Sequence, residues 1–265
     1  MVRSDISTTL STGVAEKRKG QALEAADACI RLLKERFGVR RVILFGSLVG
    51  QSAWHGRSDI DLAVEGLCPE EFFAAYSACC DLLPRGLELD LVPLEDAYPE
   101  MRARILGEVE MPDDPMLALQ GLIEDELVAL ERVVKNTEEA LASFSDAPNQ
   151  FELHGLAAYL HQFYTGVESI FERIVVWSGE GLPRGEYWHV DLLNQMAEEQ
   201  PGVRLAVINE PLRARLREYL GFRHFFRHAY GYMLLWNKMR WKAENMSDTL
   251  KILRDQLHIF FEAMS

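Results

Sequence analysis

The chain lacks the features that mark membrane-spanning, secreted and disulfide-stabilised proteins. No apolar run approaches the roughly 20 residues that a membrane-spanning helix needs. The N-terminal stretch MVRSDISTTLSTG has no apolar segment of the kind found in signal peptides. The 4 cysteines show no metal-ligand spacing, so we expect reduced thiols in the core of a cytoplasmic protein. Internal repeats and low-complexity tracts are also missing, which leaves a globular protein with no membrane partner.

Positive charge is scarce overall, because the formal net charge is −13. This balance argues against a general nucleic-acid coat, and we expect no DNA partner. One segment has the opposite sign: from Arg204 to Lys242, nine Lys or Arg are opposed by only Glu210 and Glu218. Such a basic island can attract an anion locally. The alternative is a solvated helix face that pairs with acids elsewhere in the fold.

The hydrophobic patterning changes near MPDDP (111–115), a stretch typical of a linker. Before it, the chain predicts the order helix, strand, strand, helix, strand, helix, with strands in RRVILFGS, DIDLAVEG and LELDLVPL. After it, the patterning predicts helices over 116–143, 151–177, 186–199, 209–243 and 247–264. We therefore expect a loose tail over 1–13, an α+β domain over 14–112 and an all-α helical bundle over 113–265.

Three acidic residues are candidates for a metal site in the first half. Asp59 and Asp61 alternate with apolar residues on one predicted strand, and Asp90 does so on another. Clustered carboxylates repel one another unless a cation lies among them, and their oxygens suit Mg²⁺, which recruits phosphates. The turn FGSLVG adds Gly46 and Ser47, whose backbone N–H groups can bind phosphate oxygens. Taken singly, each piece can also be an ordinary solvated turn or strand edge.

The stretch GSLVGQSAWHGRSDIDLAV, followed by ELDLV, resembles the Gly-Ser…Asp-x-Asp signature of nucleotidyltransferases related to DNA polymerase β. More narrowly it resembles the minimal nucleotidyltransferases (MNT), although the 11 residues between Ser47 and Asp59 exceed the usual spacing by one. The resemblance implies that Gly46 and Ser47 hold the phosphates of ATP. It implies that Asp59, Asp61 and Asp90 bind two Mg²⁺ ions, with Asp90 also catalytic. Two-metal chemistry activates the acceptor oxygen and stabilises the leaving pyrophosphate.

A second motif lies in the basic island, in GFRHFFRHAYGY (221–232). Arg223, four residues, His228, one residue and Tyr230 resemble the Arg-x4-6-His motif of HEPN-domain ribonucleases, in the longer form that ends His-x-Tyr. The resemblance spans roughly 115–264 and implies metal-independent cleavage of RNA (a tRNA or an mRNA) by Arg223 and His228. It also implies a homodimer formed through the helical domain. These residue types suit RNA cleavage. Imidazole titrates near neutrality and can therefore act as a general acid or base, and a guanidinium can bind the oxygens of the phosphorane.

The neighbours of this motif supply further cations. We expect Arg217, His224 and Arg227 to bind RNA, the arginines along its phosphate backbone. On a regular helix, His224 lies about 100° and His228 about 140° around the axis from Arg223. The side chains of Arg223 and His228 therefore do not converge unless the turn is irregular or a two-fold partner supplies the missing group.

Together the two motifs resemble the HEPN/MNT toxin–antitoxin pair, here fused on one chain. The resemblance implies that the nucleotidyltransferase adds AMP to Tyr230, where the new anionic group pairs with arginines that otherwise hold RNA. One alternative is an aminoglycoside-type nucleotidyltransferase that adenylylates a small hydroxylated substrate, with a structural or substrate-lining helical domain. Another is a non-enzymatic interaction module in which both sites have decayed, but all motif residues are intact.

Overall fold

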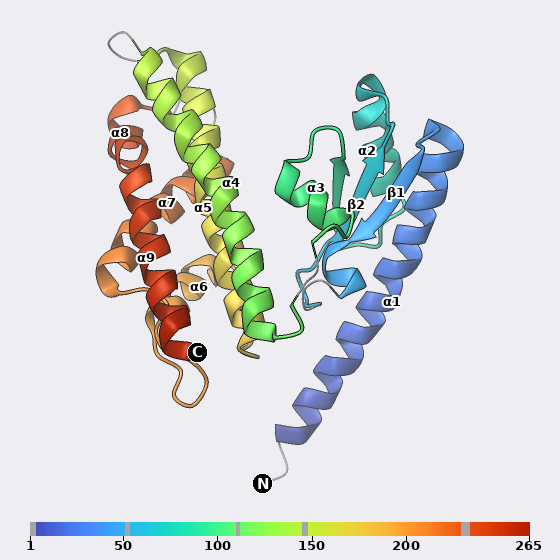
Figure 1. Ribbon diagram of the computed structural model, residues 1–265, viewed down its shortest axis with the longest axis horizontal. Coiled ribbons are helices and arrows are strands. Elements are labelled where there is room, and N and C mark those ends of the chain that lie inside the picture. Colours follow the sequence, from blue (N-terminus) through green and yellow to red (C-terminus); the bar gives the residue numbers. More distant parts are fainter. Residues whose placement is uncertain (1–3, 51–53, 110–111, 145–147, 229–233) are drawn as a thin grey trace. The chain divides into compact units, whose positions relative to one another are not determined.

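The computed structural model describes residues 4–50, 54–109, 112–144, 148–228 and 234–265. The chain divides into two compact units, Met1–Met111 and Pro112–Ser265. The first unit combines helices with a three-stranded sheet, and the second is built from helices (Figure 1). The predicted fold class, an α+β domain followed by a helical bundle, is confirmed.

The first unit follows the predicted order of elements. Its helices and strands are α1 (Ser4–Phe37), β1 (Arg41–Phe45), β2 (Ile60–Glu65), α2 (Phe72–Cys80), β3 (Leu89–Pro93) and α3 (Pro99–Ile105), with short 3₁₀ turns η1 (Gly46–Val49) and η2 (Pro69–Glu71). Helix α1 begins earlier than expected, so most of the stretch predicted as a loose tail is helical. No proline interrupts that stretch.

Strand β2 lies at the centre of the sheet, antiparallel to β1 and parallel to β3. Ile60 and Leu62 of β2 and Leu89 and Leu91 of β3 are buried in one core cluster together with apolar residues of α1. Ala63, on the alternate side of β2, packs in a second small cluster that includes Ile105 of α3. The alternation of strand side chains therefore leaves the aspartates on the face opposite α1.

The four cysteines are free thiols, but they do not share one environment. Cys29 and Cys79 are buried, and Cys80 is half-buried. Cys68 is exposed, so the expectation that all four lie in the core is wrong for this residue. It precedes the turn η2, where the chain passes from β2 to α2 at the surface.

The second unit contains six helices within the described ranges: α4 (Pro115–Ser143), α5 (Gln150–Trp177), α6 (Trp188–Ala197), α7 (Glu210–His228), α8 (Trp236–Glu244) and α9 (Met246–Met264). The single helix predicted over 209–243 is wrong, because α7 and α8 are separate. Leu235, just before α8, has an extended backbone with φ −124° and ψ 128°. None of the helices in the described ranges has the length and apolar character needed to cross a membrane.

Local capping fixes where the two longest helices of this unit begin. Asp114 accepts hydrogen bonds from the backbone of Met116 and Leu117, with Pro115 at the first helical position of α4. Asn149 and Glu152 form a reciprocal capping box at the start of α5. These caps satisfy backbone N–H groups that have no partner inside the helix.

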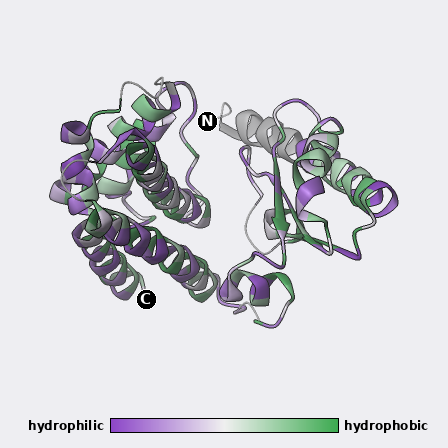
Figure 2. Ribbon diagram, turned by 90° about the horizontal axis from the view of Figure 1, so that it is seen from above, coloured by the Kyte–Doolittle hydropathy of each residue, from purple (hydrophilic) through white to green (hydrophobic). Residues whose placement is uncertain are grey.

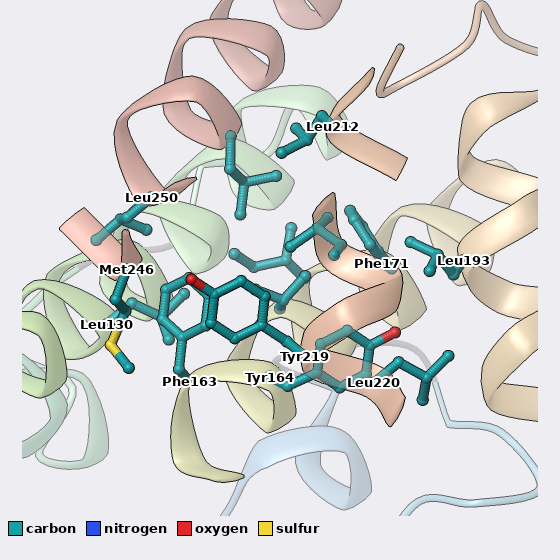
Figure 3. Close-up of a cluster of buried hydrophobic side chains, with 14 of the residues drawn as sticks. Leu130, Phe163, Tyr164, Phe171, Leu193, Leu212, Tyr219, Leu220, Met246 and Leu250 are labelled. Carbon is teal, nitrogen blue, oxygen red and sulfur yellow. The ribbon is translucent and has the colours of Figure 1, made fainter. Parts of the chain in front are cut away.

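The helices of the second unit are amphipathic, with hydrophilic and hydrophobic residues interspersed along them (Figure 2). Their apolar faces meet in a core that contains Phe163, Tyr164 and Phe171 of α5 and Tyr219 of α7 (Figure 3). The rings of Phe163 and Tyr219 lie 5.0 Å apart between centroids. The Tyr219 hydroxyl donates a hydrogen bond to the carbonyl of Lys242, 2.8 Å away, which ties α7 to α8.

Truncation of Phe163 tests how far the second unit depends on this core. We expect Phe163→Ala to lower the free energy of unfolding by about 3–5 kcal/mol, because a fully buried aromatic ring leaves a cavity. Phe151→Ala on the same helix is the matched control, since Phe151 is 88% exposed, and its effect should stay within about 0.5 kcal/mol. Urea unfolding of the full chain, followed by circular dichroism, measures both. Equal effects would contradict the packing described.

Candidate functional site

The first candidate site is the aspartate face of the sheet. Asp61 and Asp90 are register partners on the parallel strands β2 and β3, and Asp59 precedes β2 by one residue. Because side chains two residues apart on a strand share a face, Asp59 and Asp61 project to the same side. The structure therefore brings the three predicted carboxylates onto one face of one sheet.

Two carboxyl groups of this face have pKa values above their usual range. Burial, together with the charge of Glu88, raises the pKa of Asp59 to about 6, while Arg18 opposes the shift. Desolvation also raises the pKa of Asp90, although this residue keeps substantial solvent contact. Glu88, a residue that the sequence analysis did not single out, thus adds negative charge near Asp59. Within the described ranges, no three His, Cys, Asp or Glu side chains are gathered closely enough to hold a metal ion.

The Gly-Ser turn lies against this face. Gly46 opens η1 with φ +73°, a conformation that L side chains rarely adopt. A Cβ atom at this position would lie 2.1 Å from Oδ2 of Asp61, so the carboxylate occupies the space that any other residue would need. Ser47, the next residue, is buried. The glycine is therefore required by the approach of Asp61 as well as by its own backbone.

Arg18 of α1 organises the loop before β2, a role that the sequence analysis did not predict. Its guanidinium donates hydrogen bonds to the carbonyls of His55 at 3.2 Å, Ser58 at 3.0 Å and Gly86 at 2.9 Å. It also lies 5.3 Å from the ring centroid of Trp54. Three carbonyls from two loops thus converge on one side chain, and no local pattern in α1 signals this contact.

Substitution of Gly46 tests the fit of the turn against Asp61. Gly46→Ala and Gly50→Ala both place a side chain at positive φ, which costs roughly 1–2 kcal/mol. Only Gly46→Ala also meets a carboxylate, because a Cβ at Gly50 has nothing within 4 Å. We expect Gly46→Ala to lower the unfolding free energy more than Gly50→Ala, as measured by urea denaturation. The same loss for both variants would mean that Asp61 moves aside without cost.

The second candidate site is a ring of three buried polar side chains in the helical unit. Arg223 of α7 forms an ion pair with Glu168 of α5, with 3.1 Å between Nε and Oε2. Nη1 of Arg223 lies 3.0 Å from Nε2 of His189 in α6. Nδ1 of His189 in turn lies 2.5 Å from Oε1 of Glu168. All three residues are buried, so the ring ties α5, α6 and α7 together.

The hydrogen-bond chemistry of this ring fixes the tautomer of His189. A guanidinium can only donate, so Nε2 of His189 must accept from Arg223. The proton of the neutral imidazole then lies on Nδ1 and is donated to Glu168. Burial lowers the pKa of Arg223, while the charge of Glu168 raises it. Arginine stays charged in proteins, so the ring holds one cation beside one anion.

Two further polar residues of α5 lie near Arg223. His161 has its pKa lowered by burial and by the charges of Arg223 and Arg227. Burial, together with the charge of Glu168, raises the pKa of Tyr164 well above its usual value. His161 also packs against Phe226, at 5.6 Å between ring centroids. The sequence analysis missed these residues, yet a signal existed: His161, Tyr164 and Glu168 recur at helical spacing, in step with the apolar residues of α5.

The remaining predicted residues of the helical site have different surroundings. His224 is half-buried, and its ring lies 5.3 Å from that of His189 in an edge-on contact. Arg217 and Arg227 are exposed. His228 is the last residue of α7, and its side chain lies outside the description, as does the whole of Tyr230. Arg223 is thus fixed internally, whereas two of the predicted RNA-binding arginines face solvent.

Removal of Glu168 tests the buried ring. We expect Glu168→Ala to lower the unfolding free energy by about 3–5 kcal/mol, because Arg223 would be left as an uncompensated buried charge. Glu210→Ala is the matched control, since Glu210 pairs with Arg213 on the exposed face of α7 and surface pairs contribute little. Urea unfolding of both variants provides the comparison. A small effect of Glu168→Ala would show that the ring does not stabilise the bundle.

The two units match two different family models. Residues 27–111 match the family described as Polymerase beta, Nucleotidyltransferase, and residues 155–264 match the family described as HepT-like protein. No curated protein and no solved structure matches the chain. The aspartate face and Gly-Ser turn lie within the first match, and the buried ring of Arg223, Glu168 and His189 lies within the second. The chain therefore combines a polymerase β-type nucleotidyltransferase domain with a HepT-like, HEPN-type domain.

Proposed function

We propose that this chain is a toxin and its antitoxin in one polypeptide. In this proposal the nucleotidyltransferase domain transfers AMP from ATP to Tyr230 of the HEPN domain, and the modification silences RNA cleavage. The observation that carries the proposal is the presence of both domains on one chain, each with its motif residues intact. We also propose that the domains divide near residue 113, and that the helical domain forms a homodimer.

The nucleotidyltransferase half of the proposal rests on the aspartate face. Asp59, Asp61 and Asp90 share one face but are not gathered into a metal-holding cluster, so they would have to close around Mg²⁺, an ion that carboxylate oxygens suit. Bound Mg²⁺ supplies positive charge to the phosphate oxygens. Gly46 and Ser47 bind the phosphates through the turn that lies against Asp61.

The transfer step conserves atoms and charge. The phenolic oxygen of Tyr230 attacks the α-phosphorus of ATP, the bond from that phosphorus to the bridging oxygen breaks, and pyrophosphate leaves. Asp90 accepts the phenolic proton as the general base. The products are Tyr230-AMP and pyrophosphate. Because donor site and acceptor share a chain, the effective concentration of the acceptor is about millimolar, which favours complete modification.

The ribonuclease half rests on Arg223 and His228. The 2′-hydroxyl of RNA attacks the adjacent phosphorus and the 5′-oxygen leaves, giving a 2′,3′-cyclic phosphate and a 5′-hydroxyl end. His228 moves protons in this step, since imidazole titrates near neutral pH. Arg223 stabilises the phosphorane oxygens, and its ion pair with Glu168 and contact with His189 fix the guanidinium before RNA binds.

Silencing follows from charge and position in the sequence. Tyr230 is two residues from His228 and belongs to the same basic island as Arg223 and Arg227. An AMP group on the phenol adds a negative charge and several acceptor oxygens, which compete with RNA phosphates for these arginines. The HepT-like match over 155–264 weighs against the aminoglycoside-type alternative, in which the helical domain would serve only a small substrate.

Intact-mass spectrometry tests the modification. After incubation with ATP and Mg²⁺, the wild-type chain is expected to gain one or more AMP groups. Asp59→Ala/Asp61→Ala and Tyr230→Phe are both expected to keep the bare mass, the first for lack of metal ligands and the second for lack of the acceptor.

Tyr219→Phe is a matched control, because it removes a buried tyrosine hydroxyl that packs within the core. It should be modified as fully as the wild type. A bare mass for the wild type under all conditions, or full modification of Tyr230→Phe, would contradict self-adenylylation. EDTA should abolish the mass gain, because in this proposal Mg²⁺ supplies the positive charge that the phosphate oxygens need.

A further inference from the structure

A groove lies beside the proposed nuclease motif, between helices α7 and α8. Its volume is about 640 Å³, and its walls are residues of the second unit only. Helix α7 contributes Gly221, Phe222 and Phe225, which flank Arg223 in sequence. Leu234 and Met239 form part of an apolar floor, because both are buried. The groove therefore adjoins the motif helix without including the ring around Arg223.

Positive charge predominates in the walls of this groove. Arg217 of α7 and Lys238 of α8 line it and are exposed. Lys242 also lines it and is paired with Glu218, the one acid among the lining residues, at 3.3 Å between Nζ and Oε2. Three cations against one carboxylate leave an excess of two positive charges in a protein whose net charge is −13. Such a surface attracts a polyanion locally.

Aromatic rings alternate with these cations. Trp241 of α8 lines the groove and is 43% exposed, with the guanidinium of Arg215 5.7 Å from the centroid of its ring. Phe225 lines the groove, and the ammonium of Lys238 lies 5.9 Å from the centroid of its ring. Rings that can stack on bases, beside cations that can bind phosphates, are the combination by which proteins hold single-stranded nucleic acid without reading its sequence. The volume suits one or two nucleotides rather than a duplex.

We propose that this groove binds a single-stranded stretch of RNA next to the site of cleavage. A base stacks on Trp241, and the flanking phosphates bind Arg217 and Lys238. The inference rests on the proposed function, because it names where the substrate of Arg223 and His228 is held. It also predicts preference for single strands over duplexes, since paired bases cannot reach the ring of Trp241.

Fluorescence anisotropy with a labelled 12-nucleotide single-stranded RNA tests the groove. The full chain carries His228→Ala, so that RNA is bound without being cut. In this background, Arg217→Gln/Lys238→Gln is expected to weaken binding at least tenfold. The slope of log K against log salt should fall by about 1.4, because each phosphate contact to a single strand contributes about 0.7. Trp241→Leu is expected to weaken binding about fivefold or more, through lost stacking.

Lys135→Gln/Lys251→Gln is the matched control, because it removes the same charge from two exposed lysines of α4 and α9. It should change affinity less than twofold and leave the salt slope unaltered. Equal losses in the groove and control variants would overturn the proposal in favour of nonspecific attraction. The proposal would also be overturned if duplex RNA bound as tightly as the single strand. Free AMP that displaces the labelled RNA at the same nucleotide concentration as unlabelled RNA would overturn it too.

The outcome for the groove is separable from that for the nuclease. The groove variants could lose RNA binding while the chain that retains His228 cleaves no RNA. That result supports RNA binding in the groove and contradicts the proposed nuclease activity. Cleavage that depends on His228 but proceeds equally in Arg217→Gln/Lys238→Gln and in the control supports the nuclease and overturns the groove. Circular dichroism checks that Trp241→Leu still folds. The check is needed because the rings of Trp241 and Tyr219 pack together, with 6.3 Å between their centroids.

Discussion

The ion pair between Arg223 and Glu168 is the constraint on which the helical half of the molecule depends. A guanidinium buried in an apolar bundle is costly unless an anion and hydrogen-bond acceptors surround it. Glu168 supplies the anion and His189 the acceptor, each from a different helix. On the proposed function, the same contacts also fix the orientation of the arginine that takes part in cleavage. Stability and preorganisation of the site thus come from the same contacts.

The aspartate face poses the opposite electrostatic problem. Here acids crowd together, burial raises the pKa of Asp59 to about 6, and Arg18 offsets the repulsion only in part. On the proposed function, a divalent cation relieves this crowding, and the Gly-Ser turn lies beside it because Asp61 approaches Gly46 closely. The chain therefore holds an acidic face in one unit and a basic island in the other. On the proposed function, the first site modifies the second.

Local patterns predicted most of the fold because each element carries its own signal. The alternation around Asp59 and Asp61 identified β2 and its acidic face, and the Gly-Ser turn identified the bend before it. The long-range contacts had no such signal. Nothing near Arg18 indicates that it binds carbonyls of two loops, and nothing near His189 indicates that it accepts from Arg223. The division of 209–243 into α7 and α8 was missed because its apolar periodicity continues across the break.

The central claim is that the nucleotidyltransferase domain silences the HepT-like domain, and the rate of RNA cleavage tests it most directly. Wild-type chain and Asp59→Ala/Asp61→Ala are each incubated with ATP and Mg²⁺ and then given a labelled single-stranded RNA. The account predicts that the variant cleaves at least tenfold faster than the wild type, and that adding His228→Ala to the variant abolishes cleavage. Equal rates for the wild type and the variant, or cleavage that survives His228→Ala, would contradict it.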